Sequence, residues 1–111
     1  MRNNPLVSLK KQADFNRVFN SKKSAANKLF VVYAAVNALP YNRLGLSISK
    51  KVGCAVVRNR IRRLVKECMR LKPDISGGHD IIVIARSGSP PDSFVNVSGS
   101  LSQLLRKLGL T

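Results

Sequence analysis

Three short apolar runs constrain what this chain can fold into more than any other feature of its sequence. Residues 29–36 (LFVVYAAV) and 80–86 (DIIVIAR) are rich in β-branched side chains, which is typical of strands, and we expect the first run to be buried on both faces. Residues 43–49 (RLGLSIS) alternate strictly, so one face should pack and the other should be a flat face of Gly45 and two serines. Together the three runs predict a sheet.

Helical spacing accounts for most of the remaining chain. Apolar side chains recur at this spacing in residues 9–20 and 94–108, and residues 55–70 (AVVRNRIRRLVKECMR) combine an apolar stripe with a basic face. Residues 24–26 allow one further short strand. The predicted order is helix, two or three strands, helix, strand, helix. This order is typical of the α+β class, here a two-layer sandwich of a mixed sheet with helices.

The length and the charge of the chain limit its class. With 111 residues, 44% of them hydrophobic, we expect residues 1–111 to fold as a single domain, with residues 1–8 as a flexible basic arm. Twenty Lys and Arg against five Asp and Glu give a net charge of +15, which favours a polyphosphate partner. No apolar run reaches the roughly 18 residues of a spanning helix, and residues 1–11 lack a signal-peptide core. We therefore expect a cytoplasmic protein with no membrane partner.

The basic helix is the main candidate for nucleic acid contact. On a helical wheel its cations gather on one wide face, opposite an apolar face that includes Ile61 and Val65. The alternative is a solvated helix face, but Glu67 is the only acid within this helix that can pair with the cations. Arginine also donates two hydrogen bonds in a fork that suits phosphate. The residues predicted to contact nucleic acid are Arg58, Asn59, Arg60, Arg62, Arg63 and Lys66.

Two further lysines, Lys50 and Lys51, lie just before the basic helix. Amide groups at a helix N-terminus carry partial positive charge, so a phosphate could bind there as well. Two solvated loop lysines explain the same residues equally well. From this argument alone the two interpretations stay open.

A second candidate surface pairs two aromatic residues of the first helix with one face of the first long strand. Phe15 and Phe19 lie one helical turn apart, and Val31, Tyr33 and Ala35 share one face of the strand. Unpaired bases stack on aromatic platforms of this kind. The residues alone favour a core role instead, because phenylalanine at helical spacing usually belongs to a core. Tyr33 is the exception, since its hydroxyl needs a polar partner or water.

The sequence contains no catalytic or cofactor motif. The five acids are scattered along the chain, and His79, the one histidine, stands alone in a turn. Cys54 and Cys68 lack the spacing of a zinc site. Neither a glycine-rich phosphate loop nor a signature of the common RNA-binding modules is present. We therefore expect no catalytic residue, no protein-bound metal and no small-molecule substrate.

Residues 44–67 (LGLSISKKVGCAVVRNRIRRLVKE) resemble the arginine-rich signature of the protein subunit of bacterial ribonuclease P. Four further segments match this family in order and at ordinary spacing, so the resemblance covers nearly the whole chain. They are LKKQADFNRVF (9–19), ANKLFVVY (26–33), HDIIVIAR (79–86) and LSQLLRKL (101–108).

The resemblance implies an RNA-binding subunit of an endoribonuclease that removes the 5′ leader from precursor tRNA. In this family a catalytic RNA subunit holds Mg²⁺ and performs the hydrolysis, so the protein alone is not expected to be catalytic. Its implied partners are the ribonuclease P RNA subunit and precursor tRNA. The resemblance also implies a left-handed crossover through the basic helix, against the usual right-handed preference.

Residue roles carry over from the family by position. The family's RNA-subunit-binding positions correspond to Lys50, Lys51, Arg58, Asn59, Arg60, Arg62, Arg63 and Lys66. The positions lining its central cleft, which accepts the single-stranded leader, correspond to Phe15, Phe19, Val31, Tyr33 and Ala35. This correspondence reverses the core interpretation of the two phenylalanines and suggests that the flat face around Gly45 belongs to the cleft floor.

Two other classes of protein fit part of the sequence. A noncatalytic ribosomal or assembly protein of similar architecture fits the charge and the size, but the arginine signature together with the aromatic cleft argues against it. A self-sufficient nuclease would need clustered acids, or a histidine with a nucleophile or a metal, and the dispersed acids argue against that class. The protein alone should then cleave nothing.

Overall fold

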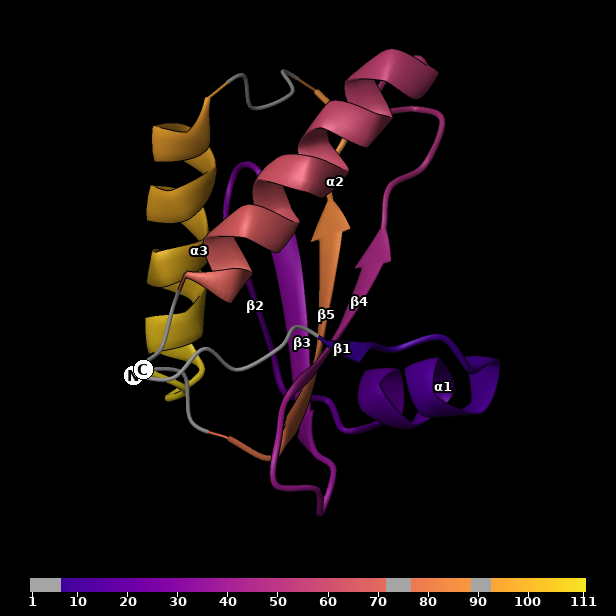
Figure 1. Cartoon of the computed structure of the whole chain (residues 1–111), viewed down its shortest axis with the longest axis vertical. Coiled ribbons are helices and arrows are strands. Elements are labelled where there is room, and N and C mark those ends of the chain that lie inside the picture. Colours follow the sequence, from indigo (N-terminus) through magenta and orange to yellow (C-terminus); the bar gives the residue numbers. More distant parts are fainter. Residues whose placement is uncertain (1–6, 72–76, 89–92) are drawn as a thin grey trace.

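The computed structural model describes residues 7–71, 77–88 and 93–111 of the chain (Figure 1). In chain order, these residues form β1 (Val7–Ser8), α1 (Gln12–Asn20), β2 (Ser24–Ala26), β3 (Phe30–Val36), β4 (Arg43–Ser47), α2 (Ala55–Arg70), β5 (His79–Ala85) and α3 (Phe94–Lys107). The predicted order of helices and strands is confirmed from α1 onward. The short strand that residues 24–26 allowed is β2.

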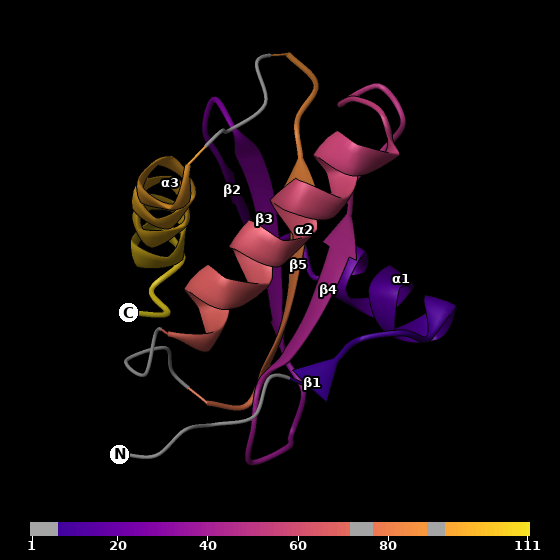
Figure 2. The same cartoon turned by 45° about the horizontal axis from the view of Figure 1, so that its top comes forward.

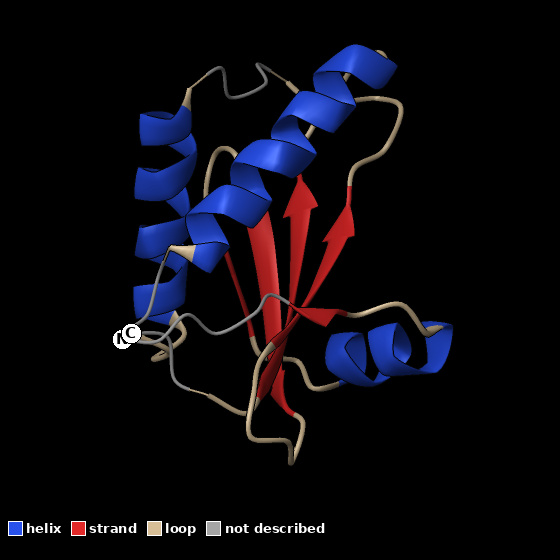
Figure 3. Ribbon diagram, viewed as in Figure 1, coloured by secondary structure: helices blue, strands red, loops and turns tan. Residues whose placement is uncertain are grey.

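The strands form one mixed sheet, red in Figure 3, in the order β1-β4-β5-β3-β2. β5 runs antiparallel to β3 and parallel to β4, so that Tyr33, Ile82 and Gly45 stand in register across the three strands. At the edges, β2 pairs antiparallel with β3, and β1 pairs parallel with β4. Helices pack on this mixed sheet, so the α+β class predicted from the sequence is confirmed.

The connection from β4 through α2 to β5 is a left-handed crossover. In Figure 1 the arrows of both strands point upward, α2 lies in front of the sheet, and β5 lies to the left of β4. A right-handed connection would place β5 to the right of β4 in this view, and nearly all parallel βαβ units are right-handed. The handedness expected from the family resemblance is therefore present.

The main core lies between the sheet and the helices α2 and α3, which pack side by side on one face (Figure 2). Phe30 and Val32 of β3 point into this core and are buried, as are Ile81 and Val83 of β5. The expectation that residues 29–36 are buried on both faces is wrong for the other face. There every second side chain of β3 is only half-buried, because among the described residues just one short helix packs against that face.

That short helix is α1. Its buried residue Val18 contacts Leu9 and Ile82 in a second, smaller apolar cluster. α1 begins at Gln12 and not at residue 9 as predicted, because Leu9 continues the line of β1: its backbone N–H donates to the Leu44 carbonyl at 2.8 Å. The helix therefore covers only part of its face of the sheet.

β1 replaces part of the predicted arm. The sequence predicts a flexible arm for residues 1–8, which is wrong for Val7 and Ser8, since both pair in parallel with β4 opposite Arg43 and Leu44. β4 would otherwise be an open edge with unpaired backbone groups, and a neighbouring segment of any composition gains hydrogen bonds there. The rest of the predicted arm lies outside the described residues.

Candidate nucleic-acid interface

The helix α2 has one buried face and one charged face. Its buried side chains are Ile61, Val65, Cys68 and Met69, at the spacing of a core-facing stripe. Burying a large aliphatic side chain of this kind stabilises a fold by roughly 1.5–3 kcal/mol. Packing therefore fixes the rotation of α2 on the sheet and turns the side chains of Lys and Arg outward.

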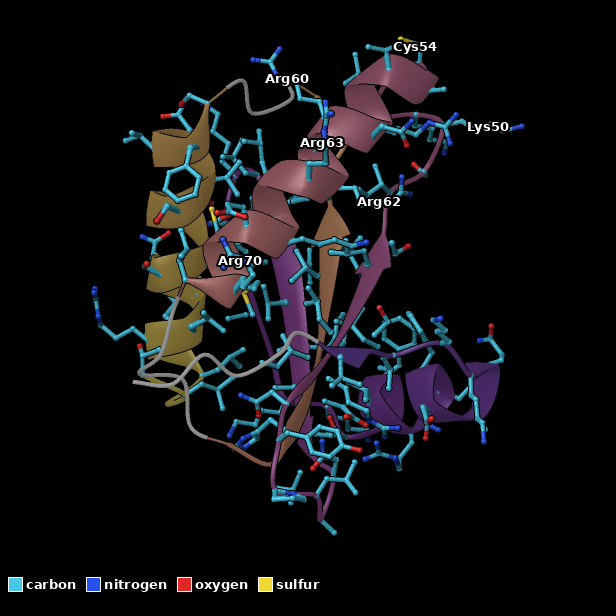
Figure 4. All side chains as sticks on the ribbon, viewed as in Figure 1. Lys50, Cys54, Arg60, Arg62, Arg63 and Arg70 are labelled. Carbon is cyan, nitrogen blue, oxygen red and sulfur yellow. The ribbon has the colours of Figure 1, made fainter. Side chains whose placement is uncertain are left out.

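The structure places the cations predicted to bind RNA on the outer surface of α2 and in the turn before it (Figure 4). The exposed members of the predicted set are Lys50, Lys51, Asn59, Arg60, Arg63 and Lys66. Arg58 and Arg62 are half-buried. Figure 4 shows Arg62 on the side of α2 that faces β4, toward Lys50, and Arg60 on the side that faces α3.

Two hydrogen bonds orient side chains at this surface. Arg62 Nη1 donates to Asn59 Oδ1 at 2.8 Å, which holds the guanidinium along the helix. Arg58 Nε donates to the Gly53 carbonyl at 3.2 Å, which ties the first turn of α2 to the residues before it. Side chains that are already ordered lose less conformational entropy when a ligand binds.

The charge of α2 is strongly unbalanced. Six cations and a single acid give residues 55–70 a net charge of +5 out of the chain's +15. The acid, Glu67, accepts a hydrogen bond from Arg70 Nη2 at 2.6 Å, in a pair whose two side chains are each about half exposed. So dense a positive surface repels itself, and the binding of phosphate groups removes that repulsion.

The residues predicted to bind the leader gather on the opposite face of the sheet. The rings of Phe15 and Phe19 have centroids 6.3 Å apart, and Phe19 meets Tyr33 edge to face at 5.0 Å. Val31 and Ala35 flank Tyr33 on the same face of β3. All five side chains are half-buried, so each packs against its neighbours and still leaves part of its surface for a ligand. We call these five residues the α1-side surface.

Gly45 of β4 makes room for the aromatic side chains. A Cβ atom at this position would lie 2.6 Å from Phe15 Cζ, so any larger residue would push the ring off the strand. The next row of this face places Val31, Ile84 and Ser47 in register across β3, β5 and β4. Val31 and Ile84 are half-buried and Ser47 is exposed, so this row extends the α1-side surface across the sheet.

A buried carboxylate ties α1 to the sheet. Asp80 is fully buried and accepts hydrogen bonds from Arg43 Nε at 2.8 Å, Arg43 Nη2 at 2.7 Å, Asn37 Nδ2 at 2.8 Å and the guanidinium of Arg17 in α1. Burial by itself would raise the pKa of Asp80, but these donors and the two guanidinium charges outweigh it and hold the pKa below its usual value. The carboxylate is therefore ionised at neutral pH.

The sequence does not predict this ion cluster, because along the chain Asp80 is one of five scattered acids. A signal was present: a single acid at the start of an apolar strand run marks a charge that will be buried and will need partners. The partners Arg17, Asn37 and Arg43 come from three other parts of the chain. Only the fold brings them to one place.

Comparisons with known proteins point to one family. The family model described as Ribonuclease P matches residues 4–109. The ribonuclease P protein component of Clostridium kluyveri is 46% identical over 105 residues, which cover 92% of this chain and 94% of that protein. The corresponding component of Clostridioides difficile is 43% identical over 110 residues, covering 97% of this chain and 96% of that protein.

The chain belongs to the ribonuclease P protein family.

Solved structures of ribonuclease P proteins share this fold. The protein from Staphylococcus aureus matches with a TM-score of 0.85 at 38% identity, covering 96% of this chain and 98% of that one. The protein from Thermotoga maritima matches with a TM-score of 0.80 at 35% identity, covering 90% and 96%. The mixed sheet with its three helices is thus the fold of the ribonuclease P protein family.

Membership in the ribonuclease P protein family argues against the ribosomal or assembly protein that fits the charge and the size.

Two further findings concern the described residues alone. Across residues 7–71, 77–88 and 93–111, no three His, Cys, Asp or Glu side chains gather in a group that could hold a metal ion. In the same parts of the chain, no helix has both the length and the apolar character needed to cross a membrane.

Proposed function

We propose that this chain is the protein subunit of a ribonuclease P holoenzyme and assists a catalytic RNA subunit in removing the 5′ leader from precursor tRNA. The observation that carries the proposal is the outward face of α2, where cations outnumber acids six to one in a chain of the ribonuclease P protein family. A surface with this charge fits a polyphosphate partner.

In this proposal α2 binds the RNA subunit. Arg60, Arg63 and Lys66 are exposed on the helix, and Lys50 and Lys51 extend the positive surface beyond its first turn. The arginines donate forked hydrogen bonds to phosphates, and the lysines add point charges. Each phosphate neutralised releases counterions, so affinity should fall steeply with salt.

The α1-side surface binds the leader of the precursor. Bases of an unpaired strand stack on Phe19 and Tyr33, which is worth about 1–3 kcal/mol per base. The row formed by Val31, Ile84 and Ser47 gives the strand a path across the sheet toward β4. Lys50 follows the end of β4 within three residues of Ser47, so the path leads to the cations before α2.

Hydrolysis belongs to the RNA partner in this proposal. Metal-assisted cleavage of a phosphodiester needs an activated water and a stabilised leaving oxygen. The described residues offer no ligand set for a metal ion, and Asp80 is committed to two guanidinium groups. We therefore assign Mg²⁺ to the RNA subunit. The protein contributes affinity for the leader, reduces phosphate repulsion and broadens the range of precursors that are cleaved.

The test mixes a precursor tRNA, the candidate RNA subunit and Mg²⁺ at low salt, with and without this protein, and follows release of the 5′ leader on a gel. We expect the protein to stimulate cleavage and to cleave nothing without the RNA. A double variant, Arg63→Ala with Lys66→Ala, should lose the stimulation. Arg106→Ala with Lys107→Ala removes the same charge from the last turn of α3 and should keep it. A lack of stimulation by the unmodified protein would contradict the proposal.

A further inference from the structure

A hollow lies where α2 faces the start of α3, apart from the α1-side surface on the opposite face of the sheet. Figure 4 shows Arg60 and Arg63 along this part of α2, with Arg70 near its far end. We call the hollow the α3-side groove and define it by the residues that the argument uses. They are Arg60, Arg63, Leu64, Glu67, Arg70 and Phe94.

Part of the groove is apolar, and its side chains are not fully buried in the core. Phe94 is 39% exposed and Leu64 is half-buried. The backbone at Phe94 is nevertheless held in place: its carbonyl contacts Cys68 Sγ of α2 at 3.9 Å, and the preceding Ser93 caps α3 by accepting the Asn96 N–H at 3.2 Å. A part-exposed phenyl ring among arginines, on a backbone that is held in place, is the kind of platform on which an unpaired base stacks.

The groove also contains the single acid of α2. Glu67 receives both Nη2 and Nε of Arg70, at 2.6 and 3.3 Å, so its carboxylate is held in one orientation at the groove. An ionised carboxylate has about four acceptor positions, so two remain for a ligand. A carboxylate repels phosphate but accepts hydrogen bonds from the edge of a base. Guanine offers two adjacent donors there, N1–H and the 2-amino group.

We propose that the α3-side groove binds one unpaired guanosine of an RNA strand. The base stacks on Phe94 and Leu64, its Watson–Crick edge donates to Glu67, and the flanking phosphates pair with Arg60 and Arg63. This inference rests on the proposed RNA-binding function and adds to it a base-specific contact apart from the leader. It also gives a reason for an acid on a helix whose other charges are all positive.

The test titrates the full chain, labelled with nitrogen-15, with three five-nucleotide RNAs that differ only at the central base: AAGAA, AAIAA with inosine, and AAAAA. Inosine lacks the 2-amino group. We expect AAGAA to shift the amide signals of Leu64, Glu67 and Phe94. Its affinity should be about 10-fold higher than that of AAIAA, at the lower end of the discrimination given by paired base contacts.

Two variants separate the base contact from the charge. Glu67→Gln should remove the preference of AAGAA over AAIAA. Phe94→Leu keeps an apolar side chain at the site and should weaken all three RNAs, AAGAA by about 5-fold or more, because one stacking contact is lost. Val95→Ala is the matched control, since Val95 is 76% exposed and does not line the groove.

Several outcomes would overturn the inference. They are equal affinity for AAGAA and AAIAA, a preference that survives Glu67→Gln, or shifts confined to the α1-side surface. A dimer that forms through Phe94 and is unaffected by RNA would also overturn it, because the groove would then bind a second copy of the chain. None of these results depends on leader removal. The guanosine proposal can therefore be wrong while the protein still stimulates cleavage. It can also be right if the protein does not stimulate cleavage.

Discussion

On α2 the charged side chains point to solvent, whereas on the other face of the sheet one carboxylate, that of Asp80, is buried. The pair Glu67–Arg70 on α2 is about half exposed at both side chains. Asp80, in contrast, has no exposed side-chain surface and is held by Arg17 and Arg43. The first surface leaves its charge exposed, and the second uses charge to fix α1 and its aromatic rings on the sheet.

This difference separates binding from architecture. An exposed ion pair contributes about 0–1 kcal/mol to stability, whereas removing one partner of a buried pair costs several kcal/mol. Substitutions of the charged side chains on α2 should therefore change the affinity for RNA and leave the stability of the fold nearly unchanged. Substitutions around Asp80 should lower stability first and alter leader binding as a consequence.

The largest effect should come from Asp80→Asn. We expect a loss of about 2–3 kcal/mol in the free energy of unfolding, below the ~3–5 kcal/mol of fully buried pairs, because Arg17 and Arg43 remain 41% and 22% exposed. Urea denaturation measures the loss. Glu67→Gln, which removes the exposed pair on α2, is the control and should cost less than about 1 kcal/mol. Equal losses of free energy of unfolding in the two variants would contradict the difference between the two surfaces.

The second effect concerns leader binding. Tyr33→Ala should lower the affinity for leader-bearing precursor by about 5-fold to 100-fold, in line with 1–3 kcal/mol per stacked base, and change the affinity for mature tRNA much less. Phe19→Ala should act in the same direction. Filter binding with both RNAs measures the difference. Val36→Ala is the control, because Val36 ends the same strand and is 71% exposed. Equal losses for the two RNAs would assign Tyr33 to the core.

The third effect is a change in salt dependence. Lys66→Ala should weaken binding of the RNA subunit and flatten its dependence on the logarithm of salt concentration by roughly 0.7–0.9 log units, the value of one lost phosphate contact. Arg62→Ala should do the same. Lys107→Ala removes one charge from the last turn of α3 and should leave the slope unchanged. If Lys66→Ala and Arg62→Ala keep the original slope as Lys107→Ala does, the outer face of α2 does not contact the RNA subunit.

Acid should distinguish the two surfaces again. Because the pKa of Asp80 in the folded protein lies below its usual value, its stabilising effect is complete above the pKa of an unfolded aspartate, about 3.9, and is lost as pH falls through the lower folded value. Urea denaturation of the unmodified protein and of Asp80→Asn from pH 7 to pH 3 measures this loss. The difference between their free energies of unfolding should shrink toward pH 3. A constant gap between the two would contradict this linkage.

The smallest effect concerns a thiol at the start of α2. The backbone N–H groups of Val57 and Val56 lower the pKa of Cys54, which is exposed, whereas Cys68 is buried. Iodoacetamide should therefore modify Cys54 first. Bound RNA subunit should slow this reaction several-fold, because Cys54 lies beside the cations of α2 (Figure 4). Mass spectrometry locates the modification. If a neutral polymer protects Cys54 as well as the RNA subunit does, the protection is not due to binding.

The sequence predicts α2 closely because the information is local. The periodic apolar stripe and the cations of residues 55–70 fix both the bounds of the helix and its two faces. The bounds of β3 and β5 are predicted within one residue for the same reason. β1 could not be predicted, since Val7 and Ser8 become a strand only because the edge of β4 is free. Periodicity also says nothing about handedness, so the left-handed crossover came from the resemblance alone.

The candidate site divides in the same way. The cations of α2 follow from spacing along one helix. The α1-side surface required α1, β3 and β4 to meet, and the residues alone favoured a core role for Phe15 and Phe19, both of which are half-buried. Asp80 and its partners join segments 37 to 63 residues apart along the chain, and no pattern within one segment reveals such a cluster.

The position of β5 has a consequence for how the chain is made. β5 lies between β3 and β4, which do not pair with each other, although it is the last strand in the sequence. During synthesis β1 to β4 and the whole of α2 therefore leave the ribosome before their common neighbour exists. Pairing across such long stretches of chain is slow, and the nascent cations repel one another in the meantime. An RNA that binds only the finished α2 surface would favour the folded state by mass action.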